Sequence, residues 1–393
     1  MELKEYKLSE LLEIKNGRDH QNLSDGQYPV YGSGGIMRYA DSYLYDKPSI
    51  LLPRKGSLTN IQYCEIPFWT VDTTYYTVVD DTLANPYYLY RYLSLLDLSR
   101  LDSGTGVPSM TFDSYYNIKV KLPDITIQQN IAAVLQNLDM KIKLNRLINR
   151  NLEALAKQLY DYWFVQFDFP NEEGKPYKSS GGKMVWNEKL KRDIPASWET
   201  VVVDDVAEVF NGATPSTGDE QNYGGDVVWI TPKDLSDQKQ KFVYQGERNI
   251  SQAGYDSCST HLLPISTVLM SSRAPIGLLA IAKAELCTNQ GFKSFVPKED
   301  RIATYLYYYL QFHIKQIEQL GTGTTFKEVS REDVLKFPIL KPSDVVLDLW
   351  EERVSALNDK QLELQKENEN LVKQRNELLP LLMNGQVSLL NCD

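Results

Sequence analysis

The sequence predicts a mixed α/β fold with two pseudo-symmetric globular units, each followed by a long helix, and with the two helices pairing as an antiparallel coiled coil. Three observations predict this class: an internal repeat, short strand-like runs inside each repeat, and a heptad-like apolar stripe after each repeat. The chain has 393 residues, which is enough for two or three domains. Its hydrophobic fraction of 42% is sufficient to form buried cores.

The internal repeat consists of matching segments at a nearly constant offset. LSELLEIKNG at residues 8–17 matches VDDVAEVFNG at 203–212, an offset of 195. ILLPRKGSL at 50–58 then matches VLMSSRAPI at 268–276, an offset of 218, and the Gly-Thr-Gly at 104–106 matches the one at 321–323, an offset of 217. The increase predicts an insertion of about 22 residues in the second copy, between Gly212 and Val268.

Each copy contains the same order of expected elements. A short amphipathic helix and an Asn-Gly turn open it, at 8–17 and at 203–212. Runs rich in β-branched and aromatic residues follow, which are typical of strands (SILLP, YYTVV, DVVWI and TVLM). A Tyr/Leu helix comes next (YLYRYL at 88–93, YLYYYL at 305–310), then the Gly-Thr-Gly loop and a last strand. This order predicts a mixed α/β unit in each copy.

A stripe with 3–4 spacing follows each copy and lies on one face of a predicted helix of about 35–40 residues. The members of the first stripe are Ile131, Leu135, Leu138, Ile142, Asn145, Asn149, Leu152, Ala156, Leu159 and Trp163. The members of the second are Trp350, Val354, Leu357, Gln361, Leu364, Asn368, Leu371, Arg375, Leu378 and Leu382.

The simplest partner for each stripe is the other helix, antiparallel about a pseudo-twofold axis. The polar members of the two stripes would then fix the register, at some cost in stability. Two alternatives remain open: each helix packs only on its own globular unit, or the chain forms a homodimeric coiled coil. The predicted divisions are globular unit 1–125, long helix 126–170, linker 171–198, globular unit 199–341 and long helix 342–393.

The charge balance restricts the function. Lys and Arg number 42 and Asp and Glu 52, so the formal charge is -10, which argues against a simple nucleic-acid coat. The four cysteines lack metal-ligand spacing. No run reaches the roughly 18 apolar residues of a membrane span, and MELKEYKLSE lacks the apolar region of a secretory signal, so we expect a cytoplasmic protein with no membrane partner.

The sequence contains no convincing catalytic signature. The three histidines are isolated, and we find no nucleophile motif or metal cluster. Asn85-Pro86-Tyr87-Tyr88 is similar to the Asn-Pro-Pro-Tyr loop of DNA amino-methyltransferases but lacks the second proline, and Pro86 in a first helical turn explains it better. The Gly-rich segment at 31–35 is either a tight turn or a backbone approach to phosphate. We therefore expect a non-catalytic binding protein with two heads.

Several longer segments carry a family resemblance. QQNIAAVLQNLDMKIKLNRLINRNLEALAKQLYDYWFVQFDFP (128–170) is the most specific, followed by KMVWNEKLKRDIPASWE (183–199). YPVYGSGGIMRY (28–39) with LLPRKGS (51–57), and SSRAPIGLLAIA (271–282) with CTNQGF (287–292), are the others. In this order, over essentially the full length, the chain resembles the specificity subunit of type I restriction–modification systems.

The resemblance implies a role in DNA methylation and restriction. Each globular unit would be a target recognition domain that reads one half of a bipartite, asymmetric site in double-stranded DNA. The paired helices would set the spacer and dock two modification (methyltransferase) subunits, through which restriction (endonuclease/translocase) subunits would join. The chain would be non-catalytic and bind no cofactor, with S-adenosylmethionine held by the modification subunits.

Polar residues in the loops of both copies are the candidates for DNA contact. Arg and Lys suit guanine O6/N7, Asn and Gln suit adenine N6/N7, and hydroxyl groups suit phosphates. For each single residue, the alternative is a solvated loop side chain. The candidates are Tyr31, Ser33, Gly34, Arg54, Lys55, Ser57, Thr105, Ser109, Thr231, Lys233, Ser272, Arg273, Asn289, Gln290, Thr322, Thr324, Thr325 and Lys327.

Three other functions remain to be distinguished from this one. They are an orphan specificity subunit without partners from its own locus, a two-headed scaffold or adhesin-like binding protein, and an active methyltransferase. Since no segment of the chain is strongly basic, we expect the isolated chain to bind DNA weakly, with partner subunits supplying much of the cationic surface.

Overall fold

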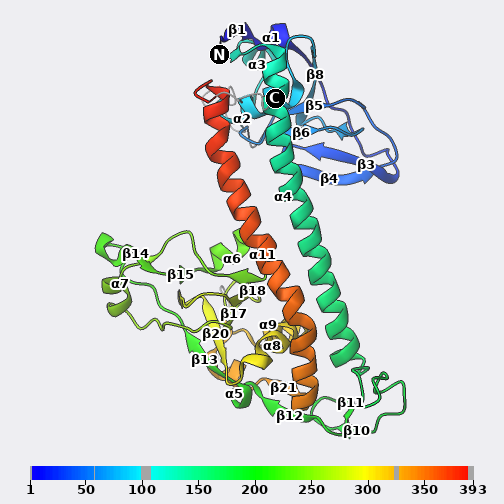
Figure 1. Cartoon of the computed structure of the whole chain (residues 1–393), viewed down its shortest axis with the longest axis vertical. Coiled ribbons are helices and arrows are strands. Elements are labelled where there is room, and N and C mark those ends of the chain that lie inside the picture. Colours follow the sequence, from blue (N-terminus) through cyan, green and yellow to red (C-terminus); the bar gives the residue numbers. More distant parts are fainter. Residues whose placement is uncertain (1, 57, 99–107, 323–326, 388–393) are drawn as a thin grey trace, which may run out of the picture. The chain divides into compact units, whose positions relative to one another are not determined.

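The computed structural model describes residues 2–56, 58–98, 108–322 and 327–387 (Figure 1). It divides into two compact units: unit 1 is Met1–Asn145 with Glu367–Asp393, and unit 2 is Arg146–Lys366. Two long helices, α4 (Ile125–Tyr160) and α11 (Asp344–Met383), each contribute residues to both units. In the described part of the chain, every helix is too short or too polar to cross a membrane.

Unit 1 is built around a sheet with strand order β2-β8-β5-β6, beside a sheet of order β4-β3-β7 and a β1-β9 pair. All five residues of β5 are buried. The elements that precede α4 are β1 (Lys4–Lys7), α1 (Leu8–Leu11), β2 (Leu12–Lys15), β3 (Asp25–Gly32), β4 (Gly35–Ala40), β5 (Ser49–Pro53), β6 (Gln62–Cys64), β7 (Trp69–Thr70), β8 (Thr74–Val79), α2 (Pro86–Ser94), α3 (Phe112–Tyr116) and β9 (Lys119–Leu122).

Unit 2 has a sheet of order β13-β20-β17-β18-β16 and the pairs β15-β19, β12-β21 and β10-β11. Its elements before α11 are β10 (Met184–Asn187), β11 (Arg192–Pro195), β12 (Glu199–Val202), α5 (Val203–Val206), β13 (Ala207–Asn211), β14 (Tyr223–Val227), β15 (Trp229–Ile230), α6 (Pro232–Gln238), β16 (Phe242–Val243), α7 (Gln252–Asp256), β17 (Val268–Ser271), β18 (Leu279–Ala282), β19 (Cys287–Thr288), β20 (Phe292–Pro297), α8 (Ala303–Phe312), α9 (Ile314–Leu320), α10 (Arg331–Leu335) and β21 (Pro338–Lys341).

The internal repeat is confirmed by strand pairing. The antiparallel series β2-β8-β5 corresponds to β13-β20-β17, and the antiparallel pair β1-β9 to β12-β21. A parallel pair also recurs, β3 with β7 and β15 with β19. Since Val30 and Trp229 occupy the same place in that pair, most of the predicted insertion lies between Ile230 and Val268, where it forms α6, β16 and α7.

The opening helix of each copy is shorter than the sequence predicts. In unit 1 it ends at Leu11, and the next four residues form β2, paired antiparallel with β8. Leu12 and Ile14 are buried whereas Glu13 is exposed, which is the alternation of a strand. Pairing with β8 therefore overrides the helical periodicity of LSELLEIK.

The segment predicted as a linker, 171–198, is packed into unit 2. It contains the antiparallel hairpin β10–β11. The ring of Phe169, just before the segment, stacks on Tyr177 at 4.6 Å and on Trp198 at 5.0 Å between ring centroids. Trp198 has only 4% of its surface exposed.

The predicted long helices are confirmed, with 36 residues in α4 and 40 in α11. Trp163 lies just past α4, in a π-helical turn (Asp161–Val165). Every apolar and amide residue of the two predicted stripes is buried or half-buried. Buried are Ile131, Leu135, Ile142, Asn145, Ala156, Trp163, Trp350, Val354, Gln361, Leu364, Asn368 and Leu382; half-buried are Leu138, Asn149, Leu152, Leu159, Leu357, Leu371 and Leu378.

Within each unit the two helices lie antiparallel. In unit 1 the Nη1 of Arg375 donates to Oδ1 of Asp139 at 2.8 Å, and the Nδ2 of Asn145 donates to Oε2 of Glu367 at 2.7 Å. In unit 2 the Nε2 of Gln361 donates to Glu153 at 3.1 Å. Residues with higher numbers on α4 therefore contact residues with lower numbers on α11. The stripes also pack on the globular parts, but the contacts between α4 and α11 contradict the alternative in which each helix packs only on its own globular unit.

In unit 1, the carboxylate of Asp139 joins three elements. It accepts hydrogen bonds from Tyr87 and Arg91 on α2 and from Arg375 on α11, while Asp139 itself is on α4. The guanidinium of Arg91 also lies 4.9 Å from the ring centroid of Tyr90. The Asp139 carboxylate thus links α2 of the globular part to both α4 and α11.

In unit 2, the buried ammonium of Lys241 has the corresponding role. Its side chain is 5% exposed, and its Nζ lies 2.7 Å from the hydroxyl of Tyr308, 2.8 Å from Oδ1 of Asn358 and 3.3 Å from Oε2 of Glu153. These partners belong to α8, α11 and α4 respectively. Burial lowers the pKa of Lys241 to about 8, although the charge of Glu153 acts in the opposite direction.

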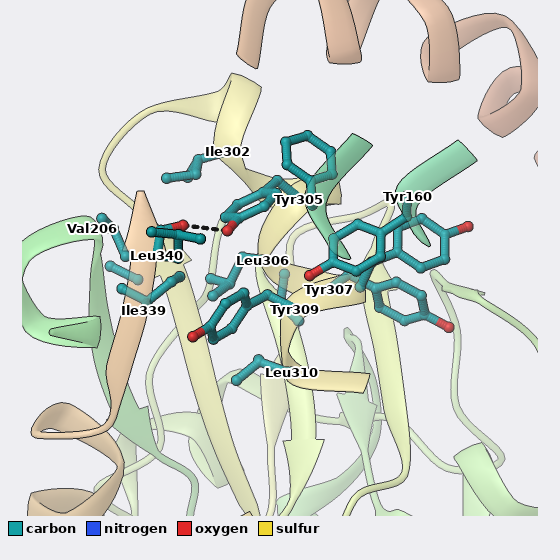
Figure 2. Packing of buried hydrophobic residues seen from close by; sticks show 14 of the residues in the cluster. Tyr160, Val206, Ile302, Tyr305, Leu306, Tyr307, Tyr309, Leu310, Ile339 and Leu340 are labelled. Carbon is teal, nitrogen blue, oxygen red and sulfur yellow. Dashed lines mark hydrogen bonds between the residues drawn. The ribbon is translucent and has the colours of Figure 1, made fainter. Parts of the chain in front are cut away.

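Aromatic side chains fill the core of unit 2 around the same helices. Figure 2 shows Tyr305 and Tyr160 within this cluster, with the hydroxyl of Tyr305 donating to the carbonyl of Leu340. The rings of Tyr160 and Tyr308 stack with centroids 5.6 Å apart, so the residue that touches Lys241 is itself held by α4.

We predict that Lys241→Met lowers the free energy of unfolding by about 2–3 kcal/mol at pH 7, because it leaves Glu153 without its cation while Glu153 keeps partial solvent contact. Urea unfolding measures the change. Lys360→Met, at an exposed ion pair on α11, is the matched control and should change stability by less than about 0.5 kcal/mol.

The pH dependence has a defined sign. The pKa of Lys241 falls from an ordinary 10.5 in the unfolded chain to about 8 in the folded one, so the unfolded state binds more protons between those values. The stability of the wild type relative to Lys241→Met should therefore rise from about pH 8 to pH 10.5. A difference that stays flat or falls over this interval would contradict burial of an ionisable amine.

Candidate nucleic-acid interface

The candidate loops begin at the ends of two equivalent buried strands. β5 and β17 lie in the middle of their sheets, and the chain leaves them at Pro53 and Ser271. The candidates Arg54 and Lys55 follow β5, and Ser272 and Arg273 follow β17. Pairing of the last strand residues with a neighbouring strand, Pro53 with Thr74 and Ser271 with Phe292, positions the residues that follow.

In unit 1, the structure brings Arg54, Lys55 and Ser109 together. The carbonyl of Arg54 accepts from the backbone of Met110 at 3.0 Å, and Lys55 pairs with Ser109 in an isolated antiparallel bridge. The Nη1 of Arg54 donates to the carbonyl of Asp72 at 3.3 Å, which directs its side chain along the protein surface. Lys55 is exposed.

The turn between β3 and β4 lies against the same loop. The Nδ2 of Asn60 donates to the carbonyl of Ser33 at 2.6 Å. Gly56 has φ +91°, and a Cβ there would lie 3.2 Å from the Oγ of Ser33. Gly34 is exposed with open space around its Cα. The turn at 33–34, where Ser33 is half-buried and Gly34 exposed, and the exposed Lys55 are therefore neighbours.

Tyr31 is less available than the turn that follows it. Its ring meets Phe68 edge-on with centroids 6.3 Å apart, and burial raises the pKa of its hydroxyl. Half-buried in β3, it contributes more to packing than to an exposed surface.

In unit 2, Arg273 is exposed but not free. Its Nε donates to Oε2 of Glu328 at 3.0 Å, and the same two residues form an isolated antiparallel bridge. Thr322 exchanges two backbone hydrogen bonds with Glu328, which places it in the same group. Ser272 is wholly buried and donates its amide to the carbonyl of Gly291 at 2.8 Å. Lys327 is exposed beside Glu328.

Thr231 and Asn289 are brought together by the parallel pair β15–β19. Each follows the last residue of its strand, and the amide of Asn289 donates to the carbonyl of Ile230 at 3.0 Å. Thr231 caps α6, where its hydroxyl bonds to Asp234 at 2.6 Å. The Oδ1 of Asn289 accepts a hydrogen bond from the backbone amide of Gly291 at 2.9 Å. The side-chain Nδ2 of Asn289 therefore points away from that amide.

Two further candidates in unit 2 have neighbours of their own. Gln290 is exposed and contacts the hydroxyl of Thr214. Lys233 forms an exposed ion pair with Glu247 at 2.7 Å, on the inserted segment rather than beside Arg273. Ser57, Thr105, Thr324 and Thr325 lie outside the described residues, so they stay predictions.

The equivalent places in the two units carry different chemistry. At the ends of the parallel pairs, Asn289 and Gln290 correspond to Val71 and Asp72. At the bridge beside the central strand, Arg273 and Glu328 correspond to Lys55 and Ser109. The same backbone framework thus presents two different sets of hydrogen-bonding groups.

Two functional candidates were missed from the sequence. Glu328 contacts Arg273, and the almost buried Lys293 on β20 contacts Glu328 at 3.3 Å. The strand pattern KSFV gives no signal that its lysine is buried beneath a loop. Glu328 was recognisable only as a charged residue close to the second Gly-Thr-Gly.

The described residues contain no group of three or more His, Cys, Asp or Glu side chains that could hold a metal ion. What the loops do offer is a set of exposed donors and acceptors on a fixed framework. Together with the duplicated mixed α/β heads and the antiparallel helices, they define a two-headed binding protein.

Comparisons with known proteins identify the family. The family model described as "Type I restriction modification DNA specificity domain" matches residues 1–154 and 195–370, once in each copy of the repeat. The chain therefore belongs to the type I restriction–modification DNA specificity family.

Two relatives agree with this assignment, and one solved structure shares the fold. The chain is 38% identical to the type I restriction enzyme MjaIX specificity subunit of Methanocaldococcus jannaschii over 167 residues, which cover 41% of this chain and 39% of that protein. It is 27% identical to the HindI specificity subunit of Haemophilus influenzae over 348 residues, covering 76% and 74%. The crystal structure of a type I S subunit from M. genitalium shares the fold, with TM-score 0.66, 14% identity and coverage of 97% and 96%.

We predict that Gly56→Ala destabilises unit 1 by about 1–2 kcal/mol, because a left-handed backbone position strains an L side chain and the new methyl group crowds Ser33. Thermal unfolding checks the change. Gly34→Ala is the matched control: it lies in the neighbouring turn with nothing within 4 Å of the added carbon, and should have little effect. Equal losses in the two variants would refute the close approach of the 54–56 loop to the 33–34 turn.

Proposed function

We propose that this chain is the DNA-recognition subunit of a type I restriction–modification complex, in which each globular part reads one half of a bipartite, asymmetric site in double-stranded DNA. The observation that carries the proposal is the duplicated loop framework at the ends of β5 and β17, with different side chains in the two copies. Family membership supports the DNA-recognition role, since the two relatives described above are named specificity subunits.

The proposal includes a division of labour. This chain supplies base readout, and two modification subunits, carrying S-adenosylmethionine, supply the methyl transfer and much of the contact with phosphate. Restriction subunits join through the modification subunits. The acidic balance of the chain supports this division, because phosphate neutralisation requires cationic surface and the net charge of this chain is -10. With DNA as the proposed partner, we also propose that the complex acts in the cytoplasm.

The function is tested by co-expressing the chain with a cognate modification subunit. We expect a complex of one specificity chain with two modification subunits, and adenine methylation at one bipartite motif, detected by long-read sequencing of the host DNA with and without the gene. If the co-expressed proteins form no complex and produce no sequence-specific methylation, the proposal is refuted. An orphan subunit would give the complex only with modification subunits from another locus.

The two-head arrangement makes a separate prediction. Lys55→Ala should weaken discrimination in one half-site and Arg273→Ala in the other, each by roughly ten- to hundred-fold, because a base contact contributes about 1–3 kcal/mol of discrimination. Methylation rates on duplexes substituted in one half at a time measure the effect. Equal loss in both halves with either variant would contradict independent reading.

The helices are proposed to set the spacer between the halves. Inserting seven residues, about two turns, into α4 with a matching insertion in α11 should lengthen the tolerated spacer, because the antiparallel contacts would keep their register. The methylated motifs of the two proteins are compared by sequencing. An insertion in α4 alone is the control, and it should disrupt the pairing. An unchanged spacer with matched insertions would refute this role.

A further inference from the structure

Lys293, Glu328 and Arg273 form a chain of charges that leads from the core of unit 2 to its surface. The exposed fractions of their side chains are 5%, 37% and 48% in that order. The Nζ of Lys293 lies 3.3 Å from Oε1 of Glu328, and the Nε of Arg273 lies 3.0 Å from Oε2 of the same carboxylate. Each oxygen of Glu328 therefore holds one cation.

The backbone around Glu328 is fixed on both sides. Its amide and carbonyl exchange hydrogen bonds with Thr322, at 3.0 and 3.1 Å. The amide of the next residue, Val329, donates to the carbonyl of Ser272 at 3.0 Å, so this strand-like stretch is bonded directly to the residue that precedes Arg273. The carboxylate and the guanidinium are thus held on adjoining, hydrogen-bonded backbone.

Lys293 contacts Glu328 from the buried side of this loop. It projects from β20, opposite Met270 of the buried β17, and its Nζ also lies 3.5 Å from the Oγ of Ser272. Burial lowers the pKa of Lys293, while the hydrogen bond and charge of Glu328 act in the opposite direction. A buried cation that keeps its proton needs such a carboxylate partner, which favours a fixed position for Glu328.

Arg273 contacts Glu328 through the Nε side of its guanidinium group. Within the described residues, the structure gives Glu328 a hydrogen bond from the Nε of Arg273 and from neither Nη. The two Nη groups therefore remain as a pair of parallel donors on a side chain whose torsions are already restricted. That is the geometry in which an arginine donates to O6 and N7 of one guanine.

We propose that Glu328 is a positioning residue that orients Arg273 to read a guanine in one half-site, and that buried Lys293 holds Glu328 in place. The inference rests on the proposed function. The inference extends that function by naming the base that is read and by assigning roles to two residues that make no base contact themselves. Restricting the side chain before binding reduces the entropy lost on DNA contact, which benefits the matching base over others.

In the described part of unit 1, the equivalent place has different side chains. There the bridge joins Lys55 to Ser109, and Tyr75 occupies the position of Lys293. The hydroxyl of Tyr75 donates to the carbonyl of Met110 at 3.3 Å instead of holding an acid. Among the residues that the structure describes, Lys55 has no carboxylate partner of this kind, so a dependence of recognition on a neighbouring carboxylate is expected only for the half-site read by unit 2.

The test uses the complex of the full-length chain with its modification subunits and duplexes carrying its methylated motif, each substituted at one base pair. Arg273→Ala should abolish discrimination at one G·C pair of one half-site. Glu328→Gln should reduce discrimination at that same pair by roughly three- to ten-fold and leave the other half-site unchanged. In the Arg273→Ala background, Glu328→Gln should have no further effect, because it acts through the arginine.

Controls separate this role from charge and stability. Glu332→Gln removes an exposed carboxylate four residues further along the chain, on α10, and should leave discrimination intact, although both Gln variants remove one negative charge. Lys293→Met should reduce discrimination like Glu328→Gln. If that variant is too unstable to assemble, which thermal unfolding shows, the Arg273/Glu328 double-variant comparison alone decides the question.

The outcomes are distinct. Additive effects of the Arg273 and Glu328 changes, equal loss in both half-sites, or loss at a pair other than G·C would overturn the positioning role while leaving DNA recognition in place. If the wild-type complex methylates no bipartite motif, the proposed function fails and this inference fails with it. Loss confined to the one G·C pair, absent in the Arg273→Ala background, supports it.

Discussion

The structure depends on one constraint: each unit must bury two long helix segments against its globular part and still pair charged side chains where these segments meet. One charged side chain lies at the centre of this pairing in each unit. Asp139 accepts from Arg91 and Arg375 in unit 1, and Lys241 lies among Tyr308, Asn358 and Glu153 in unit 2. Both nodes connect the helix of the globular part to α4 and α11. Since an unpaired buried charge is costly, such a node also disfavours shifted helix registers.

The two nodes occupy equivalent places but have opposite chemistry. Arg91 on α2 corresponds to Tyr308 on α8, and Asp139 on α4 to Asn358 on α11. Unit 1 surrounds an acid with two arginines, whereas unit 2 surrounds a lysine with neutral groups and one acid. Duplication preserved the fold while these side chains diverged, and the same divergence appears in the loops, where Lys55 and Ser109 stand opposite Arg273 and Glu328. A protein proposed to read two different half-sites requires this difference.

Much of the fold follows from local patterns in the sequence. The repeat, the lengths of both helices and the buried stripes were predictable because a period of 3.6 residues and matched motifs are visible without three-dimensional information. The opening helix was overestimated because LSELLEIK fits both a helix and a strand, and pairing of Leu12–Lys15 with β8 decides for the strand. The segment at 171–198 has the composition of a linker, yet Tyr177 and Trp198 stack on Phe169. Such packing depends on partners that are distant in sequence.

By itself, the sequence determined the duplication, the class of fold and the family, because these depend on repeated local motifs. Only the tertiary structure decided which polar residues meet. Lys241 and Lys293 appear as ordinary surface lysines in their sequence windows, and Glu328 as an ordinary loop acid. Their burial and pairing arise from contacts across 88 residues between Lys241 and Glu153, 35 between Lys293 and Glu328, and 55 between Arg273 and Glu328. Local periodicity does not predict such contacts, because the partner of a buried ion is set by the tertiary structure and not by the residues next to the ion in the sequence.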